Sequence, residues 1–213
     1  MQPVYIFMDN SNIFIPAQEV AAGREDASAA REVRIQFDRL YELARAGRQV
    51  KSALCVGSVP PEMDAVWIKL RASGVNVELF ERGEESRSEQ GVDQCLQVHM
   101  LRALVDVEKP GVVVLLTGDG AGYWDGVGFH ADLERMKRKG WGVEVLSWEA
   151  SCNKRLKAWA EEVGVFVRLE DHYNSITFRK GSRNSVPLSL KQRKLSTPGH
   201  TSPVAATTGA LTA

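Results

Sequence analysis

The sequence predicts an α/β fold in which helices cover both faces of a parallel β-sheet. Short apolar runs alternate with longer segments of helical periodicity along most of the 213-residue chain. The apolar runs are hydrophobic nearly throughout rather than at every second residue, which is typical of strands buried on both faces. Strands that alternate with helices are joined by right-handed crossovers and therefore lie parallel in a three-layer fold.

Five apolar runs are expected to form the strands of this sheet. In chain order they are VYIFM, QVKSALCVGSV, VNVELFE, GVVVLLT and WGVEVLSW, and the run VFVRL is a candidate for a last short strand. The segments expected to be helical are VRIQFDRLYELARAG, PEMDAVWIKLRASG, GVDQCLQVHMLRAL, HADLERMKRKG and NKRLKAWAEEVG. The stretch PAQEVAAGREDASAARE, before the first of these helices, is expected to be a long loop, and loops of that length are typically functional or mobile.

The composition indicates one ordinary domain, which we expect to span residues 1–178. A hydrophobic content of 44% is sufficient for a buried core. No apolar run approaches the length of a membrane-spanning helix, and the N-terminus has no basic segment of the kind that begins a signal peptide. The three cysteines are far apart and odd in number, which fits neither a disulfide framework nor a zinc knuckle and favours a reducing cytoplasm.

Residues 179–213 are expected to form a disordered, basic tail rich in Ser, Thr and Pro. After Asp171 the chain has six basic residues and no acidic one, so the preceding part has a net charge of −6 and the tail one of +6. This division of charge is typical of a tail that binds a polyanion. It is equally consistent with a solvated tail that keeps the protein soluble.

Acidic residues follow the strands at the edge where ligands bind in open parallel sheets. Asp9, with Asn12 three residues later, follows the first strand, and Asp119 follows the fourth. Asp93 is expected in the first turn of the helix that leads into the fourth strand. Taken singly, each of these residues also fits a helix cap, an Asx turn or a favourable first-turn charge.

The combination of these acids favours a metal site over separate caps. Carboxylates ~5 Å apart repel by about 3 kcal/mol at an effective dielectric constant near 20, so a cation or a proton must offset the repulsion. A set of oxygen ligands without His or Cys suits Mg²⁺ or Mn²⁺.

The loop TGDGAGYWDG, which contains Asp119, does not fit a phosphate cradle. It has no Lys, which a Walker loop requires, and its glycines do not match a dinucleotide-binding fingerprint. We expect the glycines to let the backbone turn sharply, so that Asp119 points into the acidic pocket. Tyr123 and Trp124 in this loop are candidates for stacking on an unpaired base, or for packing the loop onto the sheet. A phosphatase of the haloacid dehalogenase type requires a second Asp at the position of Ser11.

These motifs, in this order over about residues 4–170, resemble the NYN domain family of PIN-like nucleases. The resemblance implies a sheet with strand order 3-2-1-4-5 and a Mg²⁺- or Mn²⁺-dependent ribonuclease. It implies that Asp9, Asp93 and Asp119 are metal ligands and that Asn12 orients the first of them or a phosphate. The family often has a further acid at the position that is Ala121 here. Either Asp125 replaces that acid as a ligand, or Asp125 is an ordinary residue at the start of the next helix and the site is weaker.

The expected function is hydrolysis of phosphodiester bonds in RNA, most simply single-stranded RNA. The ion would activate water and counter the charge that develops on the phosphoryl oxygens. The family pattern implies 5′-phosphate and 3′-hydroxyl products. Candidates for contacts with backbone phosphates are Arg82, Arg87, Lys137, Arg138, Lys139, Lys154 and Arg155. The alternatives are a weakly active or inactive RNA-binding protein and a metal-dependent hydrolase of small phosphoesters.

Overall fold

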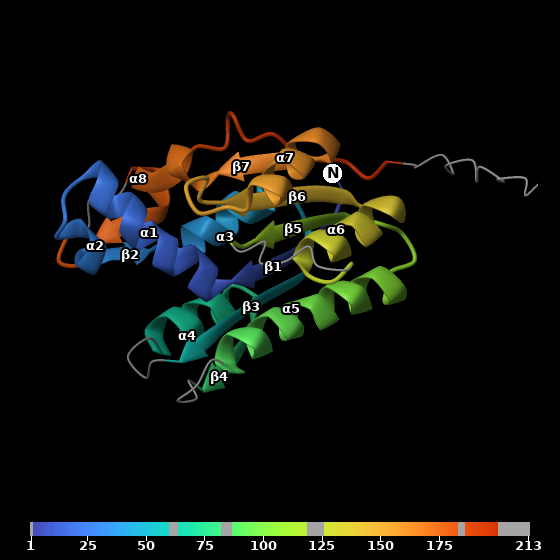
Figure 1. Cartoon of the computed structure of the whole chain (residues 1–213), viewed down its shortest axis with the longest axis horizontal. Helices are drawn as coiled ribbons and strands as arrows, with labels where there is room; N and C mark the ends of the chain where they lie inside the picture. Colours follow the sequence, from blue (N-terminus) through green and yellow to red (C-terminus); the bar gives the residue numbers. More distant parts are fainter. Residues whose placement is uncertain (1, 60–63, 82–86, 119–125, 183–185, 200–213) are drawn as a thin grey trace, which may run out of the picture.

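A six-stranded parallel sheet forms the centre of the molecule within residues 2–59, 64–81, 87–118, 126–182 and 186–199, which the computed structural model describes (Figure 1). In their order across the sheet, the strands are β4 (Asn76–Glu81), β3 (Val50–Val59), β1 (Val4–Asp9), β5 (Val112–Leu116), β6 (Gly142–Ser147) and β7 (Val165–Arg168). All neighbouring strands are parallel, so their carboxyl ends share one edge.

The observed topology confirms the predicted α/β class. The five expected strands have the order 3-2-1-4-5 when they are counted along the chain. The run VFVRL forms β7 beside β6, so the sheet has six strands instead of about five. The central strand, β1, pairs with both β3 and β5, and this places Asp9 beside Val56 of β3 and just beyond the last residue of β5 that pairs with β1.

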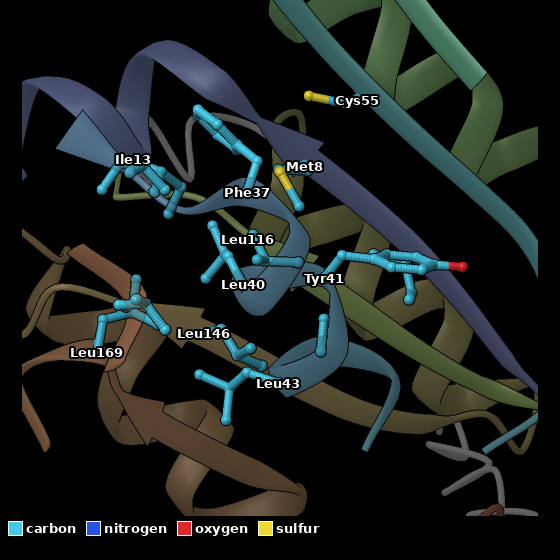
Figure 2. Close-up of a cluster of buried hydrophobic side chains, with 14 of the residues drawn as sticks. Met8, Ile13, Phe37, Leu40, Tyr41, Leu43, Cys55, Leu116, Leu146 and Leu169 are labelled. Atoms are coloured by element: carbon cyan, nitrogen blue, oxygen red, sulfur yellow. The ribbon is translucent and has the colours of Figure 1, made fainter. Parts of the chain in front are cut away.

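Helices cover both faces of the sheet. One face packs against α5 (Arg87–Asp106), α6 (Phe129–Arg138) and α7 (Lys154–Val163). The other packs against α1 (Asn10–Arg24), α3 (Phe37–Arg45) and α4 (Asp64–Ala72). Figure 2 shows part of the second core, where Leu40 and Leu43 of α3 lie among Met8, Leu116 and Leu146 of the strands. None of the helices within the described ranges is long and apolar enough to cross a membrane.

The stretch 16–32 was expected to be a long loop, but its residues up to Arg24 belong to the helix α1, and its last four residues form α2 (Ala29–Glu32). The buried residues Ile13, Ala17, Val20 and Ala21 of α1 recur at helical spacing. Two features weaken this pattern in the sequence: two of the buried residues are alanines, and Pro16 lies inside the helix. A proline in a helix interior removes one backbone hydrogen bond, but here the contact of α1 with the sheet outweighs that loss.

The helix expected from residue 33 begins only at residue 37, because the preceding residues form a strand. Strand β2 (Val33–Ile35) pairs antiparallel with β8 (Thr177–Arg179), which lies more than 140 residues later in the chain. These strands lie with α1, α2 (Ala29–Glu32), the 3₁₀ helix η2 (Leu169–His172) and α8 (Tyr173–Ile176) toward one end of the molecule (Figure 1).

The expectation that residues 179–213 are disordered does not hold for Arg179, which belongs to β8, or for residues 186–199. Residues 196–199 pack against the start of β6 at the amino-terminal edge of the sheet, and Arg193 is 8% exposed and forms an ion pair with Glu144 of β6. Val186 and Pro187 instead accept hydrogen bonds from α3 and α8. Glu144 is fully buried and also binds Arg48 through two hydrogen bonds of 2.7 and 2.9 Å. The partner that orders this segment is therefore a carboxylate in the core, about 50 residues earlier in the chain.

Candidate active site

Asp9 is a buried carboxylate at the carboxyl end of the central strand. It is 1% exposed and caps the N-terminus of α1, which begins at the next residue. Its Oδ1 accepts a hydrogen bond from the backbone N–H of Asn12 at 3.0 Å, and its Oδ2 accepts one from Asn12 Nδ2 at 2.8 Å. Asn12 therefore fixes the orientation of both carboxylate oxygens.

The charge of Asp9 affects a buried side chain of the neighbouring strand. Cys55 of β3 pairs in register with Met8, next to Asp9. Burial, followed by the nearby charge of Asp9, raises the pKa of the Cys55 thiol. A charge that reaches a buried neighbour is poorly screened by water, and such a site favours binding of a cation.

Asp93 lies on α5, on the same side of the sheet as Asp9. It is partly buried and is the seventh residue of the helix, because α5 begins at Arg87. The expectation that Asp93 lies in the first turn was therefore wrong, and the helix dipole, whose influence fades within that turn, does not explain its position. Phe7 and Val92 share one buried cluster, and side chains alternate along a strand, so Asp9 faces the helix that carries Asp93.

The end of β5 is in contact with the start of α1. Thr117 is fully buried, and a Cβ added to Gly118 would lie 3.0 Å from the Asn12 carbonyl oxygen and 3.2 Å from Ser151 Oγ. That carbonyl lacks the usual N–H donor four residues later, because the residue there is Pro16. Gly118 therefore permits a close approach of two backbones. The presence of a proline four residues after Asn12 was the signal in the sequence that could have indicated this contact. The sharp turn that we expected from the glycines of this loop involves residues 119–125, which lie outside the described residues.

The described side chains that could bind a metal ion at this edge offer oxygen atoms as ligands. The carboxylates of Asp9 and Asp93 and the hydroxyl of Thr117 are the types of ligand that Mg²⁺ and Mn²⁺ prefer. The chemistry of these residues therefore fits such an ion. Asn10, next to Asp9, is buried against Gly57 of β3, and its amide oxygen has no hydrogen-bond partner among the described residues.

A family model for the NYN domain matches residues 3–165, which is more than half of the chain. The chain belongs to the NYN domain family. This match confirms the resemblance that the motifs indicated, and it identifies the sheet as that of a PIN-like nuclease. A search among curated proteins found no match.

Part of the predicted site of this NYN domain lies outside the described residues. This applies to Asp119, Ala121, Tyr123, Trp124 and Asp125. Arg87 begins α5, but its side chain also lies outside the described part. The roles of these residues as ligands or RNA contacts stay predictions.

Of the basic residues that we considered for phosphate contacts, Arg82 lies outside the described residues, and those on α6 and α7 fall at opposite edges of the NYN domain. Lys154 and Arg155 are exposed in the first turn of α7, which follows β6 and so begins at the carboxyl edge. The side chain of Asn153 caps this turn by accepting hydrogen bonds from two backbone N–H groups. Residues 137–139 end α6 and precede β6, so they lie at the amino-terminal edge, away from Asp9. Residues 137–139 precede the β6 run in the sequence and Lys154 and Arg155 follow it, so the sequence alone could have assigned the two groups to opposite edges.

Proposed function

We propose that this NYN domain is a Mg²⁺- or Mn²⁺-dependent ribonuclease that acts on single-stranded RNA. The observation that carries the proposal is the buried carboxylate of Asp9, which Asn12 orients at the end of the central strand, with Asp93 on the facing helix. Membership of a family of PIN-like nucleases supports RNA as the substrate. We assign Asp9, Asp93 and Asp119 as metal ligands. We further assign Asp125 as the ligand that replaces the family's acid at the position of Ala121.

The residues of the chain have separate tasks in this proposal. Asn12 holds the Asp9 carboxylate in one orientation, so that little reorganisation is needed when an ion binds. The bound ion supplies Lewis-acid activation of water and of the phosphoryl group. Lys154 and Arg155 contact backbone phosphates at the same edge of the sheet, and Tyr123 and Trp124 stack on unpaired bases. The expected products carry a 5′-phosphate and a 3′-hydroxyl. The free cysteines fit a reducing cytoplasm.

The proposal predicts that Asp9→Asn and Asp93→Asn each abolish metal-dependent cleavage or raise the metal concentration for half-maximal activity at least ~10-fold. The fold should be retained, because Asn caps a helix as well as Asp does and Asp93 lies outside the first turn. The measurement is a Mg²⁺ and Mn²⁺ titration of cleavage of labelled single-stranded RNA. Asp106→Asn is the matched control, since Asp106 is an exposed acid at the far end of the same helix.

Other results would identify the alternatives. If RNA binds but is not cut at any metal concentration, the domain is an RNA-binding protein. If a generic phosphomonoester is hydrolysed and RNA is not, the domain is a hydrolase of small phosphoesters. If both Asn variants keep the metal dependence of the parent, these acids are structural and the proposal fails.

A further inference from the structure

A second group of potential metal ligands lies between the edge strand β4 and helix α5. The Sγ of Cys95 donates a hydrogen bond to Oε2 of Glu78 at 3.0 Å, and Nε2 of His99 lies 3.0 Å from Oε1 of the same carboxylate. One ligand atom from each residue lies within 4.8 Å of the other two. We name these three residues the Glu78–Cys95–His99 cluster.

This cluster is separate from the acidic site. Each residue of an α-helix advances by about 100°, so Cys95 and His99, four residues apart, share one flank of α5. Asp93 is two residues before Cys95 and therefore projects from nearly the opposite flank. In the sheet, Glu78 and Asp9 are each in register with Val56 but on different sides of it, so a whole strand separates them.

We propose that the Glu78–Cys95–His99 cluster binds a transition-metal ion of the Zn²⁺ class, independently of the acidic site. A thiolate, an imidazole and a carboxylate form a ligand set that suits Zn²⁺ or Co²⁺ and not Mg²⁺. Ligand atoms in a tetrahedral zinc site are about 3.3–3.5 Å apart, so the two contacts of 3.0 Å are within about half an ångström of that spacing. On binding, the thiol releases its proton to solvent and the neutral imidazole donates a lone pair.

The position of the cluster suits reversible binding from solution. The side chains of Glu78 and His99 are 37% and 30% exposed, so an ion reaches them directly and water takes the fourth coordination position. Strand β4 pairs with β3 on one side and is the outermost strand of the sheet on the other. The ion therefore ties the edge strand to the helix that carries Asp93, and its binding stabilises the folded chain.

Co²⁺ is the probe for the first experiment, because its bond to a thiolate gives a charge-transfer absorption band in the near ultraviolet. The full chain should bind one equivalent of Co²⁺ with this band, and Zn²⁺ should displace it while Mg²⁺ should not. Cys95→Ser should abolish the band, and Glu78→Gln and His99→Gln should weaken Co²⁺ binding at least ~10-fold. Asp93→Asn and Cys152→Ser are the controls and should leave the band unchanged, the first because its side chain lies on the other flank and the second because that thiol is buried elsewhere.

A second measurement uses the unmodified chain, so it does not depend on any variant folding. Zn²⁺ should slow the alkylation of Cys95 by iodoacetamide, with each cysteine followed by peptide mass spectrometry. Cys55 and Cys152 are buried and should react slowly with or without Zn²⁺. The proposal is overturned if Co²⁺ shows no saturable thiolate band, if the band survives Cys95→Ser, or if Zn²⁺ leaves Cys95 alkylation unchanged. In those cases Glu78, Cys95 and His99 form a hydrogen-bonded group only.

Discussion

At the scale of single residues, the contacts around Asp9 depend on small chemical details of its neighbours. Asn12 supplies both a backbone and a side-chain donor to the same carboxylate, which a residue without an amide in that place could not do. Pro16 leaves the Asn12 carbonyl without its helical donor, and Gly118 allows the end of β5 to approach that carbonyl. Substitutions of Asn12, Pro16 or Gly118 should therefore change the surroundings of Asp9, although none of these residues is adjacent to it in the sequence.

Gly118→Ala should lower the free energy of unfolding by about 1–3 kcal/mol, as overpacking of a close contact does. The added methyl carbon would lie 3.0 Å from the backbone oxygen of Asn12, and neither backbone is free to move without disturbing α1 or β5. Urea unfolding measures the change.

Gly23→Ala is the control for this experiment. Gly23 lies in the last turns of α1 with nothing within 4 Å of its missing Cβ. Alanine there should leave stability unchanged or increase it by up to about 1 kcal/mol, because alanine favours a helix more than glycine does. Equal effects of the two substitutions would contradict the proposed close approach.

At the scale of elements, contacts distant in sequence decide where several segments lie. Strand β2 forms because β8 pairs with it, and this pairing moves the start of α3 to residue 37. Arg179 of β8 strengthens the junction through ion pairs with Glu25, Asp26 and Glu32. The segment 186–199 is held in a similar way, because Arg193 enters the core to reach Glu144.

Deletion of residues 186–213 should destabilise the chain by up to about 3–5 kcal/mol, the range for breaking a buried ion pair. Glu144 would keep Arg48 but lose Arg193 and the hydrogen bond from the backbone N–H of Ser196. Deletion of residues 200–213 alone is the control, because it keeps Arg193 and Ser196 and their contacts with Glu144. Thermal unfolding of the two truncated chains beside the full chain tests this, and identical melting of all three would contradict it.

At the scale of the whole molecule, part of the positive charge of the C-terminal segment is used inside the fold. Arg179 and Arg193 both form ion pairs with acids of the domain. Lys180, Lys191 and Lys194 are exposed and keep their charge toward solvent. The difference in charge between the acidic body and the basic tail is therefore smaller in the folded molecule than in the sequence. This weakens the interpretation of the tail as a dedicated polyanion-binding arm.

The stability of the whole chain should decrease as the pH falls below about 6.5, the ordinary pKa of histidine. Burial lowers the pKa of His130 and of His172 in the folded chain, so the unfolded chain takes up protons first. The stabilising contribution of these neutral side chains is complete above pH 6.5 and is lost as the pH falls through their folded pKa values. Burial raises the pKa of Asp132, which acts in the opposite direction at lower pH.

Melting temperatures between pH 7.5 and 5.5 test this dependence. The double variant His130→Gln and His172→Gln should show a flatter dependence on pH, whatever its melting temperature at pH 7.5. A slope equal to that of the parent would show that other groups control stability in this range.

The sequence by itself determined the features that depend on local pattern. Uninterrupted apolar runs identified the strands of the sheet, because a strand buried on both faces has no polar side for solvent. The parallel topology followed from their alternation with helices, and it placed Asp9 at the ligand-binding edge of the sheet. The resemblance to the NYN domain family assigned Asn12 to Asp9, and the two residues lie close together because both belong to one turn.

Only the tertiary structure decided the features in which residues far apart in the chain meet. The helix α1 contains a proline and small side chains, so its stability comes from packing on the sheet and not from its own periodicity. The pairing of β2 with β8 and the burial of Arg193 each join segments whose local sequences give no sign of the partner. The Glu78–Cys95–His99 cluster has the same origin, since the fold places a carboxylate of β4 beside two residues of α5. Such contacts depend on the free energy of the whole assembled core, which no single stretch of the sequence contains.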